Sequence, residues 1–295
     1  FSCKNGKSSR QVSYIPQDTL TAFYLPAIPA MLNTPELRAD FLVKHYWDNV
    51  NFADTNYIHH PEVTEQAWAD YCDLLNHVPL ETAQQAMRNV IDRTNVDKKV
   101  FTYITDLADK YLYDPNSPMR NEEFYIPVLE AMIASPVLNE TEKIRPQARL
   151  KLAQKNRIGT KALNFTYTLA SGAQGSLYQL KAEYLLLFIN NPGCQACTET
   201  IEGLKNAPII NQLLQEKKLV LLSIYPDEEL DEWKKHLSEF PNEWINGYDK
   251  KFTIKEEQVY DLKAIPTLYL LDKDKTVLLK DATAPAIEAY LMQHQ

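Results

Sequence analysis

The spacing of apolar residues divides the chain into two parts. From residue 17 to about 155, apolar positions recur at the three- and four-residue intervals of amphipathic helices, and prolines and polar residues separate the segments. The expected helices start near Thr34, Pro61, Pro79, Val96, Asn121 and Asn139. A succession of helices without strands predicts an all-α domain at 17–155.

After residue 156, short apolar runs replace the helical pattern. Runs at 184–189, 219–225 and 265–271 have the length and continuity of buried strands, and a hairpin at 164–180 and a strand at 277–280 complete the expected sheet. Helices are expected from Cys194 and at 207–214, 227–240, 256–262 and 284–292. Strands that alternate with helices predict a central mixed sheet with helices on both faces, in an α/β domain at 157–295.

Two cysteines follow the first buried run almost directly. A turn at 190–193 ends the strand, and Cys194 and Cys197 then open a predicted helix. Residues three apart in a first helical turn lie on one face, so their sulfurs can close a small disulfide ring. Because the N-terminus of a helix stabilises a thiolate, we expect Cys194 to attack a disulfide and Cys197 to resolve the mixed disulfide.

A structural disulfide and half of a zinc site are the other interpretations of this pair. Zinc takes four ligands, and the chain has neither a second Cys-x-x-Cys motif nor histidines at ligand spacing. We therefore expect no metal and no cofactor. The predicted strand, turn and helix around the pair favour redox chemistry over a structural disulfide.

Charge and composition narrow the classes of partner. The net charge of -8 over 295 residues argues against a nucleic-acid surface. No apolar run approaches the length of a membrane-spanning helix. Cys72 lies on the apolar face of a predicted helix, where a cysteine acts as a small buried hydrophobic residue.

Cys3 has different surroundings from the other cysteines. It follows Phe1 and Ser2 and precedes a short polar stretch, a pattern typical of the end of a bacterial lipoprotein signal peptide. We expect residues 1–16 to form a tether and Cys3 to carry a lipid that holds the protein in the cell envelope, facing the periplasm from the outer or inner membrane. The alternative is an exposed cysteine in a disordered tail.

Residues 157–295 resemble the thioredoxin-like superfamily, in particular the TlpA-like and ResA-like thiol-disulfide oxidoreductases. The resemblance is carried by the buried strand that leads to Cys194 and Cys197, by Ile265-Pro266-Thr267 before a later strand, and by the closing hairpin and helix. It implies that Pro266 is cis beside the cysteines and that Ile265, Pro266 and Thr267 shape a substrate site. It also implies protein disulfides as substrates, reached by backbone pairing with an extended chain, and a thiol compound as electron donor.

Three departures from the family pattern concern the chemistry. Gly193 stands where most relatives have Trp, Phe188 where thioredoxins have a buried Asp, and Thr200 where TlpA-like relatives often have Glu. No proton acceptor for Cys197 is therefore assigned.

The leading hypothesis is a reductase or isomerase of protein disulfides. The alternatives are a non-catalytic binding lipoprotein with a degenerate scaffold and a thiol peroxidase, although Asn191 stands where a peroxidase would have Thr.

Residues 17–155 resemble a helical domain of unknown function that precedes thioredoxin-like domains in lipoproteins of Gram-negative anaerobes. The segments MLNTPELRADFLVKHYWDNVNF and LADKYLYDPNSPMRNEEFY carry this resemblance. That family has no established activity, so the resemblance bears on the architecture alone.

Overall fold

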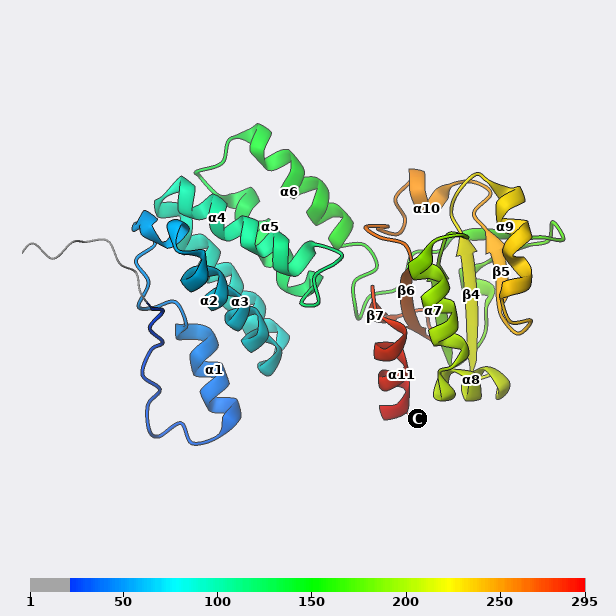
Figure 1. Ribbon diagram of the computed structural model, residues 1–295, viewed down its shortest axis with the longest axis horizontal. Coiled ribbons are helices and arrows are strands. Elements are labelled where there is room, and N and C mark those ends of the chain that lie inside the picture. Colours follow the sequence, from blue (N-terminus) through cyan, green and yellow to red (C-terminus); the bar gives the residue numbers. More distant parts are fainter. Residues whose placement is uncertain (1–21, 295) are drawn as a thin grey trace, which may run out of the picture. The chain divides into compact units, whose positions relative to one another are not determined.

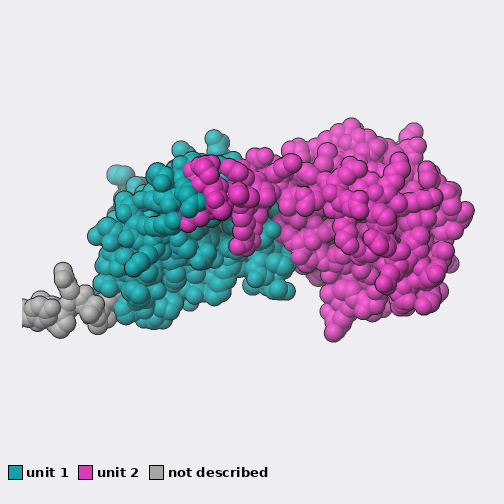
Figure 2. Space-filling view, turned by 90° about the horizontal axis from the view of Figure 1, so that it is seen from above, with its two compact units in different colours: residues 1–139 teal, residues 140–295 magenta. Residues whose placement is uncertain are grey.

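The computed structural model describes residues 22–294, and Cys3 and the expected tether at 1–16 lie outside the described residues. The chain divides into two compact units, residues 1–139 and 140–295, which Figure 2 shows in two colours. The first unit is helical and the second contains a mixed sheet, which confirms the predicted fold class. The helix α6 (Glu140–Ala153), which the sequence assigns to the helical domain, falls in the second unit.

Five α-helices form the described part of the first unit. They are α1 (Pro35–His45), α2 (Pro61–Leu74), α3 (Leu80–Arg93), α4 (Lys98–Ala108) and α5 (Glu122–Ala134). Side-chain caps set several of their starts: Asp97 and Asn121 accept hydrogen bonds from the first backbone N–H groups of α4 and α5. The expected helix at 96–113 is α4 followed by a π-helical turn, Asp109–Tyr113. The Cys72 thiol is buried in this unit, as predicted.

The second unit is built on a seven-stranded sheet in the order β2-β1-β5-β4-β3-β6-β7. Figure 1 labels its strands β4, β5, β6 and β7. Its strands are β1 (Thr166–Leu169), β2 (Gln174–Ser176), β3 (Tyr184–Ile189), β4 (Leu219–Tyr225), β5 (Ile245–Tyr248), β6 (Thr267–Asp272) and β7 (Val277–Lys280). The strands β3, β4 and β5 are parallel to one another, and β6 is antiparallel to β3. The sheet is therefore mixed, as predicted.

The strand β3 is buried on both faces, which explains its unbroken apolar sequence. Leu186 and Phe188 enter a core that also contains residues of α7 (Gln195–Lys205), α8 (Pro208–Gln215) and α11 (Ala284–Gln293). The alternate residues Leu185, Leu187 and Ile189 enter the core on the other face. That second face is covered by the segment before β3 and by residues from Ile254 to Tyr260, and only in small part by helix.

Two local predictions in the second unit are wrong. The helix expected at 256–262 is the short α10 (Thr253–Glu256), because the Asp249 carboxylate accepts the Ile254 N–H at 2.7 Å and Gln258 has φ +50°. The helix expected at 227–240 is shorter, α9 (Leu230–His236), and a 3-10 turn follows it.

The strand β5 has no counterpart among the expected strands. Asn246 and Gly247 give it the sequence of a turn, but β4 and β1 pair with it on both sides. The ring of Tyr167 on β1 lies against Gly247, where an added Cβ would be 3.0 Å from Tyr167 Cδ2 and 3.3 Å from the Thr168 carbonyl oxygen. A buried aromatic ring therefore requires the glycine, although the glycine weakens the strand signal in the sequence.

The packing at Gly247 predicts opposite effects on the free energy of unfolding for two glycine-to-alanine substitutions. Gly247→Ala should lower the free energy of unfolding by about 1–3 kcal/mol, because the methyl group displaces a buried ring. Gly203→Ala in α7 should raise it by about 0.5–1 kcal/mol, because its Cβ meets only Ala284 Cβ, at 3.9 Å, and alanine favours the helix. Urea denaturation of the two full-length variants measures both effects, and equal shifts would contradict this packing.

Candidate active site

The ends of the parallel strands bring several loops to one edge of the sheet. Because β3, β4 and β5 run in the same direction, the segments that follow them begin at the same edge. The cysteines follow β3 at this edge. The start of β6 lies there too, since Thr267 pairs with Ile189, the last residue of β3. The sheet therefore places Ile265 and Pro266 beside the cysteines.

Cys194 lies at the N-terminus of α7. It is the N-cap residue, and its carbonyl oxygen accepts the Thr198 N–H at 3.0 Å. Its side chain is partly exposed, and Sγ lies 3.7 Å from the carbonyl oxygen of Ile265. The positive end of the helix dipole favours negative charge at this position. Cys194 thus combines access from solvent with electrostatic support for a thiolate.

The backbone conformation at position 193 explains why glycine stands where most relatives have tryptophan. Its φ is +77°, in the left-handed region that favours glycine. Any side chain at this position would be strained, although nothing lies within 4 Å of an added Cβ. The turn into α7 is therefore built for a residue without a side chain.

Cys197 differs from Cys194 in its burial and in the protonation state that its surroundings favour. Only 2% of its surface is exposed. The pKa of the Cys197 thiol is raised to about 12, chiefly by burial. A hydrogen bond with the Asn191 backbone lowers this pKa, and a hydrogen bond and negative charge from Cys194 raise it. Cys197 is therefore a neutral thiol at physiological pH, next to Cys194.

The loop before β6 completes the site. The Ile265–Pro266 peptide bond is cis. Ile265 and Pro266 are partly exposed, whereas Thr267 is buried and its hydroxyl group donates to the Ala264 carbonyl oxygen at 2.6 Å. Thr267 therefore fixes the loop, and Ile265 and Pro266 form the accessible part of the expected substrate site.

A polar network at the same edge was not predicted. The Asn191 side-chain amide donates to Asp227 Oδ2 at 2.8 Å, and Lys255 Nζ donates to Asp227 Oδ1 at 2.6 Å. These three residues come from the segments after β3, β4 and β5. The signal in the sequence was the position of Asn191 and Asp227 directly beyond two predicted strands, which places both at the carboxyl edge of the sheet.

The core beneath the cysteines contains no carboxylate at the position that thioredoxins use. Phe188 occupies it and packs against Trp244, with 6.2 Å between the ring centroids. A buried polar pair at this end of the sheet is neutral: Asn190, directly after β3, donates from Nδ2 to Oγ of Ser223 on β4 at 2.8 Å. The site therefore lacks the buried acid that would accept a proton from Cys197 in thioredoxins.

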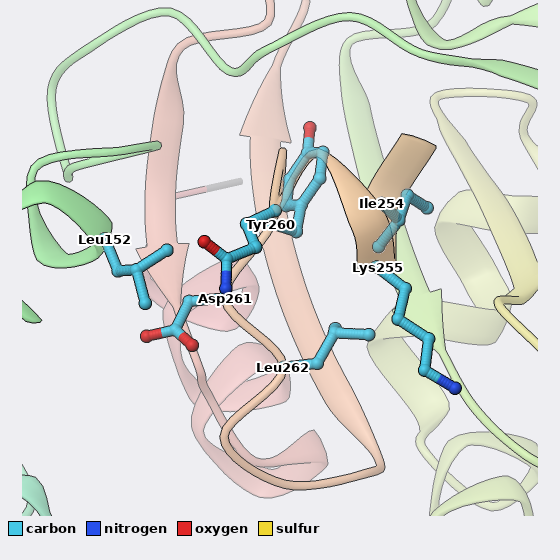
Figure 3. A pocket seen from close by; sticks show the side chains of 7 residues that line it. Leu152, Ile254, Lys255, Tyr260, Asp261 and Leu262 are labelled. Atoms are coloured by element: carbon cyan, nitrogen blue, oxygen red, sulfur yellow. The ribbon is translucent and has the colours of Figure 1, made fainter. Parts of the chain in front are cut away.

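A cavity of about 170 Å³ lies beside the segment that leads to Ile265 (Figure 3). Its lining includes Leu152 of α6 and the residues Tyr260, Asp261 and Leu262. The Lys255 ammonium group points away from Leu152 and Asp261 in this view, consistent with its contact to Asp227. The cavity is small, and it borders the polar network through Lys255 alone.

Residues 22–294 contain neither a cluster of metal ligands nor a membrane-spanning helix. No group of three or more His, Cys, Asp and Glu side chains in this range is arranged to hold a metal ion. None of the helices in this range has the length and apolar character required to cross a bilayer.

Comparison with known families covers both units. Residues 2–156 match the model for a domain of unknown function, DUF5106, and residues 182–277 match a thioredoxin-like family. The chain belongs to the DUF5106 family and carries a thioredoxin-like domain. The comparison with curated proteins found no match.

Solved structures include a close relative of the whole chain. A thioredoxin-like protein from Bacteroides caccae is 83% identical, covers 94% of this chain and 100% of its own, and superimposes with a TM-score of 0.92. The C-terminal domain of an uncharacterized protein from Bacteroides fragilis is 69% identical over 46% of this chain and 98% of its own, with a TM-score of 0.46. The thioredoxin domain of a thiol-disulfide oxidoreductase from Bacteroides vulgatus is 19% identical over 47% of this chain and 97% of its own, with a TM-score of 0.42.

The different environments of the two cysteines in this DUF5106 family member predict selective alkylation. At pH 7, iodoacetamide should modify Cys194 at least about tenfold faster than Cys197, because only thiolates react and the raised pKa keeps Cys197 protonated. The Cys197 thiolate should form only as the pH rises towards about 12. Peptide-resolved mass spectrometry of the reduced, native protein measures both rates. Equal rates at pH 7 would contradict the assignment.

Proposed function

We propose that this protein is a thiol-disulfide oxidoreductase of the cell envelope that acts on protein disulfides. The observation that carries the proposal is the asymmetry of the cysteine pair. Cys194 is partly exposed at a helix N-terminus, while Cys197 is buried and its pKa is raised to about 12. This division suits a nucleophile that meets the substrate and a second thiol that waits until a mixed disulfide has formed.

The proposed reaction has two displacement steps. The Cys194 thiolate attacks one sulfur of the substrate disulfide, forms a mixed disulfide and releases the other substrate sulfur as a thiolate, which takes up a proton. Cys197 then loses its proton to water, attacks Cys194 Sγ and releases the second substrate thiol. The products are a Cys194–Cys197 disulfide and a dithiol substrate. An external thiol donor returns the pair to the reduced state.

Substrate binding is proposed at the loop before β6. The Ile265 carbonyl oxygen lies 3.7 Å from Cys194 Sγ, so a chain that pairs with the Ile265 backbone would bring its sulfur to the nucleophile. Main-chain pairing of this kind depends little on the substrate's side chains. A reductase or isomerase with several protein substrates fits this arrangement better than an enzyme for one small molecule.

Insulin reduction with dithiothreitol as donor tests the proposed activity. The wild-type protein should accelerate precipitation of the insulin B chain, and Cys194→Ser should reduce the rate to the uncatalysed background because it lacks the nucleophile. Cys197→Ser should accumulate a mixed disulfide with the substrate, visible on a non-reducing gel. Cys72→Ala serves as the control with the pair intact and should retain activity. Equal rates for wild type and Cys194→Ser would refute the proposal.

The proposed envelope location rests on the sequence around Cys3. Protein prepared from membranes should carry acyl chains on Cys3, and stable anchoring requires more than one such chain. Cys3→Ser should shift the protein from the membrane fraction to the aqueous fraction, because the variant has no residue to carry these chains. Intact-mass spectrometry of the two proteins measures this. An unmodified Cys3 in protein from native cells would contradict the lipid anchor.

A further inference from the structure

The polar network at the carboxyl edge of the sheet reaches the cysteines through Asn191. Its side chain is tied to Asp227 at 2.8 Å, and Asp227 is tied to Lys255 at 2.6 Å. Each residue comes from a different segment after β3, β4 or β5. The contacts therefore connect three segments that the sheet alone brings together.

The backbone of Asn191 contacts both cysteines. Its carbonyl oxygen accepts the Cys194 N–H at 3.3 Å. A hydrogen bond from its backbone lowers the pKa of Cys197, against the larger effect of burial. Asn191 thus links the backbone of Cys194 and the thiol of Cys197 to the turn.

The resolving step needs a group that stabilises charge on Cys197. When this thiol loses its proton, negative charge develops on a sulfur that is only 2% exposed. Thioredoxins have a buried carboxylate nearby, but Phe188 occupies that position here. A backbone N–H donor held in a fixed position provides stabilisation of a different kind, since hydrogen bonds to charged groups are stronger than those to neutral groups.

The network also limits the repulsion that a carboxylate near the cysteines would cause. The Asp227 carboxylate is 23% exposed, and Lys255 lies against it as an ion pair. The hydrogen bond with Asp227 raises the pKa of Lys255, so the ammonium group stays protonated. Asp227 can therefore anchor the Asn191 amide while its own charge is balanced.

We propose that Asn191 is a positioning residue for the resolving step, held by the Asp227–Lys255 ion pair so that its backbone N–H meets the developing thiolate of Cys197. This inference rests on the proposed function. In the step concerned, Cys197 Sγ gives its proton to water, forms a bond to Cys194 Sγ and displaces the substrate sulfur, which leaves as a thiolate and is protonated.

The two displacement steps can be separated with dithiodipyridine, a neutral chromogenic disulfide. The reduced full-length protein, with Cys3→Ser and Cys72→Ala so that only the pair reacts, should release one thiopyridone when Cys194 attacks and a second when Cys197 resolves the mixed disulfide. Stopped-flow absorbance follows both phases. A neutral reagent is used so that changes of charge at Asp227 do not alter its approach.

Asn191→Ala should slow the second phase about tenfold and the first by less than about threefold, because the backbone N–H loses the side-chain anchor that holds it where charge forms on Cys197. Asp227→Leu removes the group that anchors Asn191 and keeps a similar side-chain volume, so it should slow the second phase in the same way. This variant provides the test if Asn191→Ala does not fold. The matched control is Asn206→Ala, at the other end of α7, where Asn206 Nδ2 donates to the Glu202 carbonyl oxygen at 2.9 Å. Its two phases should equal those of the wild type.

The pH dependence of the second phase separates positioning from a general loss of structure. Asn191→Ala should move the midpoint of this phase to higher pH, because a backbone N–H that is no longer anchored lowers the pKa of Cys197 less. Equal slowing of both phases, or an unchanged second phase in both variants, would overturn the inference. A wild-type protein that releases no second thiopyridone would instead refute the proposed function itself.

Discussion

The burial of β3 on both faces is the constraint on which the rest of the second unit depends. A strand without a polar face must pair on both edges and be covered on both sides, and β4, β6 and two apolar cores satisfy these demands. The parallel pairing with β4 brings the segments after both strands to one edge. The antiparallel pairing with β6 brings Ile265 and Pro266 to the same edge. The site therefore follows from how a single apolar strand is paired.

The same burial gives the two cysteines different properties. The turn after β3 leaves Cys194 partly exposed at the start of α7, while the first turn of that helix directs Cys197 towards the core. Burial is unfavourable to a thiolate and favourable to a thiol, so it keeps Cys197 protonated at physiological pH. The site contains no tryptophan before Cys194 and no buried acid at position 188. Contacts among Asn191, Asp227 and Lys255 occupy the region around the turn.

Much of this arrangement could be predicted from local sequence. The apolar runs at 184–189 and 219–225 are the strands β3 and β4 with the same bounds, since burial on both faces makes both runs apolar apart from Ser223. The pairing of Cys194 with the Ile265–Pro266 segment could be expected only through the family resemblance. The strand β5 could not be predicted, because Asn246 and Gly247 read locally as a turn and the reason for the glycine is a ring on another strand. The contacts of Asp227 with Asn191 and Lys255 likewise depend on distant segments and leave no periodic pattern.

The reduction potential of the Cys194–Cys197 pair tests the central claim most directly. A pair that exchanges electrons with protein disulfides must be reducible by a biological thiol donor, whereas structural disulfides have potentials below about -300 mV. Equilibration of the full-length protein with dithiothreitol redox buffers, followed by alkylation and mass spectrometry, gives the value. The account predicts a potential clearly above about -300 mV, in the range of known oxidoreductases. A value below that limit would mark a structural disulfide and contradict the proposed enzyme.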